Sequence, residues 1–146
     1  MAIDEKDIKI IEVLKENARM PIRDIAKKTG LRPSTVHLRI QRMLDDGVIE
    51  KFTAKLNNSK VGESFIVFML VNTEKHLGQA FLSNEHIKEV FGITGEYDLM
   101  LKLKFKDISK FNQFIINLRK NENIRKTLTM VVTAEVKEEL YKDPKS

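Results

Sequence analysis

Residues 19–47, RMPIRDIAKKTGLRPSTVHLRIQRMLDDG, predict two short helices joined by a tight turn. Pro21 suits the first turn of a helix, where a backbone amide would have no partner within the helix and its absence in proline costs nothing. Gly30 suits the end of the same helix, because glycine readily adopts the left-handed conformation of a helix cap. Pro33 begins a second helix that ends at Gly47. Each helix carries an apolar stripe at helical spacing, formed by Ile22, Ile25 and Ala26 in the first and by Val36, Ile40 and Met43 or Leu44 in the second. The segment therefore predicts a helix-turn-helix.

Positive charge is concentrated in the same segment. Residues 19–42 hold seven basic residues and one acid, Asp24, a local charge of +6, whereas the whole chain of 146 residues carries +5. A solvated helix face usually mixes both signs, so this distribution favours a surface that binds a polyanion. The basic residues are Arg19, Arg23, Lys27, Lys28, Arg32, Arg39 and Arg42.

On the N-terminal side, residues 4–18 predict a further helix. Asp4 is its expected cap, Glu5 and Asp7 suit the positive end of the helix dipole, and the apolar face would hold Ile8, Ile11 and Leu14 or Ala18. On the C-terminal side, residues 48–56 predict an extended strand and residues 57–64 a polar linker. We expect a DNA-binding domain over 1–50, the strand and linker over 51–63, a second domain over 64–140 and a tail over 141–146.

The hydrophobic period changes in the second domain. Strands are predicted over 64–73, 88–94, 99–106 and 127–138, a short helix over 77–83, and a longer helix over 107–121 with Asp107 as its cap. The order is β-α-β-β-α-β, typical of a ferredoxin-like antiparallel sheet with both helices on one face, so the fold class is α+β. Thr129 and Val131 are expected on the uncovered face, which is neither strongly polar nor charged and predicts a homodimer.

Several functional classes are excluded or disfavoured. The chain has no cysteine, which excludes disulfides, thiolate catalysis and cysteine-ligated zinc. The charged N-terminus is unlike a signal peptide, and the longest apolar run, Phe65–Val71, is too short to span a bilayer. We expect a cytoplasmic protein without a membrane partner, and the 32% charged content indicates a heat-adapted source. His37, His76 and His86 lack metal-ligand spacing, and no phosphate loop or nucleophile elbow occurs, so we expect no enzyme, metal or cofactor.

The residues also carry a family resemblance over nearly the whole chain. Residues 3–52 resemble the DNA-binding half of the Lrp/AsnC (leucine-responsive, feast–famine) regulators, and TGEYDLMLKLKFKD (94–107) with the following helix and TLTMVVTAEVKE is similar to their effector-binding half. The most specific parts are Arg39-Ile40 with Leu44, Gly47–Ile49 and Thr94–Asp98. The resemblance implies a transcription regulator that is dimeric, or a higher assembly of dimers such as an octamer, and that responds to a small molecule, commonly an amino acid.

Two positions depart from the family pattern. Arg32 stands at the start of the second helix of the pair, where the family often has a side chain that can cap it, so Ser34, Thr35 or a phosphate must satisfy this helix end. Only 14 residues separate Thr73 from Lys88, which makes the first helix of the effector half short and leaves the pocket shape open.

The helix over 33–47 is expected to lie in the major groove of double-stranded DNA. A helical wheel turns Ser34, Thr35, Leu38, Gln41 and Arg42 outward. Leu38 is either an ordinary exposed leucine or a contact to a thymine methyl group, and His37 is either a spacer or a contact. The other candidate contacts are Ser34 and Thr35 for bases or phosphates, Arg32 and Arg42 for bases or phosphates, Arg39 for packing with a phosphate contact, and Arg23, Lys27 and Lys28 for the DNA backbone. A two-fold dimer would prefer a pseudo-palindromic site.

Residues 95–98 have two interpretations. They form either a plain turn or, as the resemblance implies, one wall of a pocket that encloses an amino acid together with a partner's last strand. Amides near Gly95 suit a carboxylate, and Glu96 or Asp98 could hold an ammonium group. The candidate effector-binding residues are Gly95, Glu96, Tyr97 and Asp98 on the turn and Thr127, Thr129 and Val131 on the strand.

Two other functions stay open at this point. A tetrapyrrole-binding decarboxylase of the same architecture would need His76 or His86 for the tetrapyrrole. A small-molecule sensing module that does not bind DNA would leave the basic helix pair unexplained.

Overall fold

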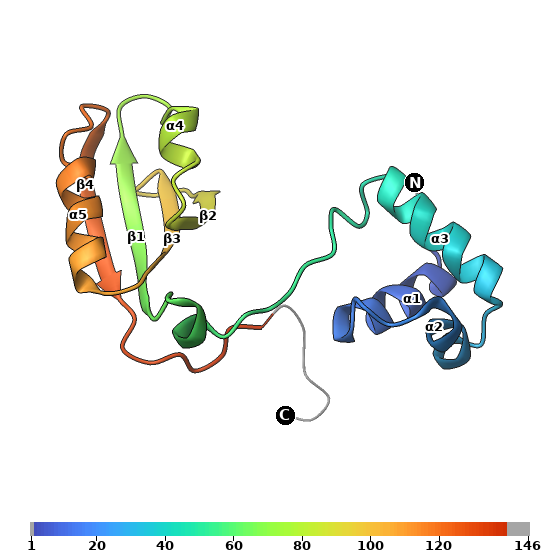
Figure 1. Ribbon diagram of the computed structural model, residues 1–146. Helices are drawn as coiled ribbons and strands as arrows, with labels where there is room; N and C mark the ends of the chain where they lie inside the picture. Colours follow the sequence, from blue (N-terminus) through green and yellow to red (C-terminus); the bar gives the residue numbers. More distant parts are fainter. Residues whose placement is uncertain (1, 140–146) are drawn as a thin grey trace. The chain divides into compact units, whose positions relative to one another are not determined.

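The computed structural model describes residues 2–139 and divides into two compact units (Figure 1). The first unit runs to Lys55 and includes the described residues 137–139, and the second unit spans Leu56–Val136. The two units contain the predicted helix-turn-helix and the predicted sheet, respectively, so the fold class is confirmed.

Three helices, α1 (Glu5–Glu16), α2 (Ile22–Thr29) and α3 (Pro33–Asp45), make up the first unit. Pro33 stands in the first turn of α3 as predicted. The buried core of the unit consists of Ile10, Ile25, Ala26, Val36 and Met43. It draws on all three helices and thus fixes them together while leaving one side of α3 uncovered.

The predicted start of α1 is confirmed, but its predicted inward face is partly wrong. The Asp4 side chain accepts the Asp7 amide at 2.9 Å, and the Asp7 side chain accepts the Asp4 amide in return, which is a capping box. Ile8 is 49% exposed, whereas Asp7 and Ile10 are buried. The inner face of α1 is therefore rotated from the predicted one. The reason is that the Asp7 carboxylate occupies an inward position, whereas apolar periodicity assigns inward positions to hydrophobic residues.

The predicted strand over 48–56 is wrong. Val48 and Ile49 pack partly against the core of the first unit, and the following residues carry no strand. A strand requires a neighbouring ladder, and the one sheet of the described chain does not include this segment. The predicted linker contains a single turn of 3-10 helix, η1 (Asn58–Val61), which Asn57 caps.

The second unit follows the predicted β-α-β-β-α-β order. Its elements are β1 (Phe65–Thr73), α4 (Gln79–Leu82), β2 (Ile87–Gly92), β3 (Leu99–Phe105), α5 (Ile108–Leu118) and β4 (Ile124–Val131). The sheet has the strand order β2-β3-β1-β4, and each neighbouring pair is antiparallel. Asp107 caps α5 by accepting the Lys110 amide at 3.0 Å, as predicted.

Both helices of this unit pack on the same face of the sheet. The inward side chains of β1 and β3, with Phe114 and Leu118 of α5, form the buried core, and Phe81 of α4 lies against it. Phe105 is fully buried and makes edge-to-face contacts with Phe111 and Phe114. No α-helix of the described residues packs on the other face of the sheet, where Asn58 of η1 accepts a hydrogen bond from Lys104.

The register of β4 corrects two predictions. The strand begins at Ile124 and ends at Val131, not at Thr127 and Glu138, because β1 offers few residues beyond Val67, the partner of Val131. Thr129 is paired with the buried Met69, so Thr129 and Val131 lie on the helix side and not on the uncovered face.

Part of the uncovered face is nevertheless apolar. Leu128 and Met130 of β4 lie opposite Leu70 and Phe68 of β1, and their exposed fractions are 45% and 40%. Phe91 of β2 is 60% exposed and is paired with Met100 of β3. An apolar sheet face of this kind is usually covered by a second sheet.

Across residues 2–139, every helix is too short or too polar to cross a lipid bilayer.

Candidate nucleic-acid interface and effector site

The turn between α2 and α3 is built as the sequence predicts. Gly30 ends α2 with φ of 72°, in the left-handed region that glycine enters without strain. Arg32 precedes α3 in an extended conformation, and its side chain forms no capping hydrogen bond. The amides of the first turn of α3 therefore have no cap from Arg32 and suit an anion or water.

One face of α3 is open to solvent. Leu38 is 68% exposed, which is high for an apolar residue in the middle of a helix. Thr35 is half-buried, at the edge of this face. The other exposed side chains on α3 between residues 34 and 41 are Ser34, His37 and Gln41. The structure thus brings the predicted base-contact candidates together on one surface.

Four exposed cations belong to α2 and to the residue that precedes α3. Arg23 is 80% exposed at its side chain and lies 3.7 Å from Asp24, a weak surface pair. Lys27 and Lys28 in the last turn of α2 are exposed, as is Arg32 before α3. Within residues 2–139 none of these last three side chains has an acidic partner, so their charges are available to phosphate groups.

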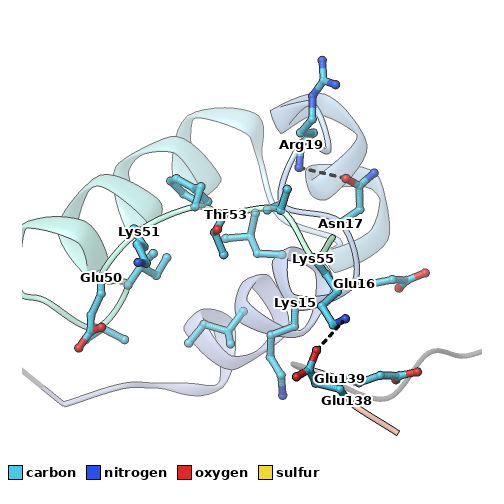
Figure 2. Close-up of a pocket in the computed structure, with 17 residues that line it drawn as sticks. Lys15, Glu16, Asn17, Arg19, Glu50, Lys51, Thr53, Lys55, Glu138 and Glu139 are labelled. Carbon is cyan, nitrogen blue, oxygen red and sulfur yellow. Dashed lines mark hydrogen bonds and ion pairs between the residues drawn. The ribbon is translucent and has the colours of Figure 1, made fainter. Parts of the chain in front are cut away.

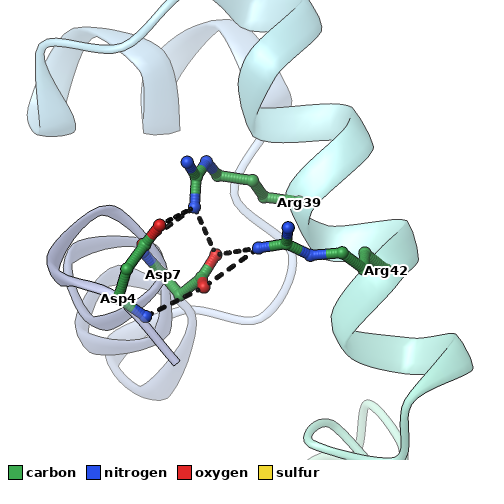
Figure 3. A network of polar contacts seen from close by, with 4 residues as sticks. All are labelled: Asp4, Asp7, Arg39 and Arg42. Carbon is green, nitrogen blue, oxygen red and sulfur yellow. Dashed lines mark hydrogen bonds and ion pairs between the residues drawn. The ribbon is translucent and has the colours of Figure 1, made fainter. Parts of the chain in front are cut away.

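Arg39 and Arg42 are placed differently, in the contact between α1 and α3 (Figure 3). Arg39 Nη1 lies 2.8 Å from both Asp4 oxygens and 2.9 Å from Asp7 Oδ1, and only 19% of its side chain is exposed. Arg42 Nη2 lies 3.2 Å from Asp7 Oδ2, with 47% of its side chain exposed. Both charges already have partners, although half of Arg42 still reaches solvent.

These pairs shift two pKa values. Hydrogen bonds from the Arg39 guanidinium and then from the Asp7 amide stabilise the Asp4 carboxylate and lower its pKa to about 2. The same contacts with Asp4 and Asp7 raise the pKa of Arg39. The sequence predicts packing with a phosphate contact for Arg39 but assigns Asp7 only to the positive end of the helix dipole. Asp7 stands three residues before Ile10, which lies on the inner face of α1, and this helical spacing indicates that Asp7 lies on the same face.

A groove of about 920 Å³ lies elsewhere on the first unit, between the second half of α1, residues 48–55 and the returning residues Glu138 and Glu139 (Figure 2). Lys55 and Glu138 form an ion pair of 3.3 Å at its edge. Its lining is of mixed charge, and none of the predicted site residues contributes to it. This groove is therefore separate from the exposed face of α3.

The turn over 95–98 is held firmly by its neighbours. Gly95 has φ of 113°, which favours glycine. The Asp98 carboxylate accepts the Thr73 amide at 2.8 Å, and Asn72 Nδ2 donates to the Glu96 carbonyl at 2.8 Å. Asp98 is thus engaged in holding the turn against the end of β1.

Lys126 of β4 joins this turn from the other side of β1. Its ammonium group pairs with the Glu96 carboxylate and lies 5.0 Å from the centre of the Tyr97 ring, a cation–π geometry. The pair with Glu96 raises the pKa of Lys126. In the single chain, both candidate acids of the turn therefore have partners.

The predicted strand residues lie at a different place. Thr127 and Thr129 line a groove of about 490 Å³ between β4 and α5, together with Asn112, Ile115 and Arg119. Lys126 is paired with Asn72 on the uncovered face, and Thr127 is paired with Val71 on the helix side. Val131 does not line the groove. In one chain the predicted effector residues therefore share no groove, because Thr127 and Thr129 line this one and residues 95–98 do not.

None of the three histidines belongs to a candidate metal site of the described residues. The His86 ring stacks on Phe105 with 4.6 Å between ring centres, and its Nδ1 lies 3.0 Å from the Lys104 carbonyl. This ring serves packing. Among residues 2–139 no group of three or more histidine, aspartate or glutamate side chains has the geometry to hold a metal ion.

Comparisons with known proteins agree with both halves of the fold. Residues 3–50 match the family of winged helix-turn-helix DNA-binding domains, and residues 66–141 match the Lrp/AsnC ligand binding domain. The HTH-type transcriptional regulator FL11 of Pyrococcus furiosus is 35% identical over 140 residues, which cover 93% of each chain. A transcriptional regulator from Neisseria meningitidis, solved in complex with L-methionine, is similar over 95% of each chain with a TM-score of 0.88 and 25% identity. An AsnC family regulator from Agrobacterium tumefaciens is similar over 95% of each chain with a TM-score of 0.87 and 26% identity.

The lowered pKa of Asp4 predicts how acid affects the α1–α3 contact. A carboxylate whose pKa falls from 3.8 to about 2 on folding stabilises the fold above its unfolded pKa, and this contribution is lost as the pH falls from about 4 to about 2. Asp4→Asn keeps a good helix cap and removes the charge. We expect wild type to exceed this variant in free energy of unfolding, measured in urea, by a constant amount above about pH 5 and by almost nothing at pH 2. A difference that does not change with pH would contradict this account of the ion pair.

Proposed function

Because the chain belongs to the Lrp/AsnC family of DNA-binding transcriptional regulators, we propose that its dimer reads a pseudo-palindromic site with α3 and that its second unit senses a small molecule, most simply an amino acid. The observation that carries this proposal is the open face of α3 in a unit that also exposes Lys27, Lys28 and Arg32, none of which has an acidic partner in the described chain. As a transcriptional regulator, the protein would act in the cytoplasm.

The exposed side chains divide into two roles. Ser34, Thr35, His37 and Leu38 occupy the N-terminal half of α3, the part of a recognition helix that meets base edges in the major groove. Leu38 suits a thymine methyl group. Arg23, Lys27, Lys28 and Arg32 would contact phosphates and position the helix, and the exposed half of Arg42 would add another phosphate contact. Arg39 would act chiefly through packing.

The uncovered sheet face supports self-association. Leu128, Met130 and Phe91 leave an apolar surface that a second copy could cover. A two-fold pair of chains would present two α3 helices and therefore match two half-sites about one helical turn, or a multiple of it, apart. Higher assemblies of such dimers, an octamer among them, belong to the same proposal.

For the effector, the similarity to a regulator solved with L-methionine supports an amino acid. Two places in the chain have suitable groups. The turn at Gly95–Asp98 offers amides and acids, but its acids are paired. The groove beside α5 offers the hydroxyls of Thr127 and Thr129 and the guanidinium of Arg119, which suit a carboxylate.

The DNA-binding proposal predicts a change in salt dependence. The binding constant of the full chain for a duplex that it selects from a random library should fall steeply with salt, because phosphate contacts release counterions. In Lys27→Ala/Lys28→Ala, the slope of log binding constant against log salt should shrink by about 0.9 for each phosphate contact removed. Mobility shift over a salt series measures it, with Lys110→Ala in the second unit as control. A slope equal to wild type would exclude both lysines from the interface.

The effector proposal predicts stabilisation by a ligand. An amino acid that binds only the folded chain raises its stability, by about 2.7 kcal/mol at a hundredfold excess over the dissociation constant. We expect thermal unfolding of the full chain with each of the twenty amino acids, L-methionine first, to show such a rise for at least one. Thr129→Val, which removes a hydroxyl at nearly constant volume, should abolish the rise if the groove is the site, whereas Thr133→Val should keep it. No rise with any amino acid would contradict the proposed effector class.

A further inference from the structure

The contact between α1 and α3 contains a fully buried carboxylate. Asp7 has 0% of its surface exposed and is on the same helix as Ile10 of the apolar core. A buried charge is costly unless donors surround it. Asp7 accepts from Arg39 Nη1 at 2.9 Å, from Arg42 Nη2 at 3.2 Å and from the Asp4 amide at 3.2 Å. Its oxygens thus meet three donors, two of them from α3.

These two arginines fix α3 about its own axis. Arg39 and Arg42 are three residues apart and therefore neighbours on one side of the helix, about 4.5 Å apart along its axis. Figure 3 shows both guanidinium groups converging on the same carboxylate. Apolar packing has little directional preference, whereas charge-assisted hydrogen bonds demand both distance and angle. Two such bonds, one turn apart, resist both rotation and sliding of α3.

The same contacts also cancel charge. Asp4 and Asp7 face Arg39 and Arg42, so two acids match two bases in this cluster (Figure 3). The cluster stands at the edge of the exposed face of α3, since Leu38 is 68% exposed and Arg42 47% exposed at its side chain. Asp4 and Asp7 therefore affect both the direction of the base-contact residues on α3 and the amount of positive charge beside these residues.

We propose that Asp7 is a positioning residue for sequence discrimination: it holds α3 in the rotation at which its exposed face meets base edges, and it restrains the binding of unspecific DNA by neutralising arginine charge. This inference rests on the proposed function, because it assumes that α3 reads DNA. Asp7 itself makes no contact with DNA in this account.

The test compares two duplexes, one selected by the wild-type chain from a random library and one of scrambled sequence, at a single salt concentration. Asp7→Asn removes the charge and keeps the shape of the side chain. We expect the ratio of the two affinities to fall by at least about tenfold, comparable with the loss of one good base contact. Affinity for the scrambled duplex should stay equal or increase, because arginine charge is released.

Asp24→Asn is the matched control. It removes the same charge from the same unit, but Asp24 lies on α2 with 43% of its side chain exposed and has only a 3.7 Å pair with Arg23. It should change both affinities together and leave their ratio at the wild-type value. The folded fraction of each variant is measured by circular dichroism before binding.

A merely structural role gives a different result. A loss of folded chain lowers both affinities by one factor and leaves the ratio unchanged, and an unchanged ratio overturns the proposal. If Asp7→Asn does not fold, Arg39→Lys keeps the charge and loses the planar geometry, and the same fall in ratio is required of it. If wild type itself fails to discriminate the two duplexes, the proposed function fails, which is separate from a failure of the Asp7 variant.

Discussion

Helix α3, the proposed recognition helix, needs a fixed packing against α1 on one side and an exposed surface on the other, and the buried Asp7 carboxylate meets this constraint. It lies where α1 crosses α3 and receives two arginines from α3. If both guanidinium groups turned away, the buried Asp7 charge would lose its counter-charges, which is strongly unfavourable. In the first unit, the apolar core supplies most of the buried surface that holds the three helices together. The ion pairs of Asp7 fix the orientation of α3 within that core.

Local features of this fold could be predicted from the sequence. The caps Asp4 and Asp107, the helix start at Pro33 and the left-handed stop at Gly30 each depend on a few adjacent residues. Features that depend on distant partners could not. The strand predicted over 48–56 needs a neighbour in a sheet, and the inward place of Asp7 depends on arginines more than thirty residues away.

The same distinction between local and distant features explains why the residues of one candidate site lie together as predicted and those of the other do not. The proposed DNA-binding surface depends on helical periodicity and local charge. Its exposed residues therefore lie together as predicted, whereas Arg39 and Arg42 pair with α1. The effector residues depend on the register of β4 against β1. A strand alternates its faces, and the register places Thr127 and Thr129 beside α5 while Lys126 faces the turn at Glu96.

The central claim is that the exposed face of α3 reads bases, and Leu38 allows the most direct measurement. Replacing each thymine of the selected duplex in turn by deoxyuridine removes only the methyl group that Leu38 would contact. We predict that one such replacement weakens binding by wild type several-fold and has no effect on Leu38→Ala, whose own affinity for the unmodified duplex is already reduced to that level. If no replacement separates wild type from Leu38→Ala, the exposed leucine does not read DNA, and the orientation assigned to α3 is contradicted.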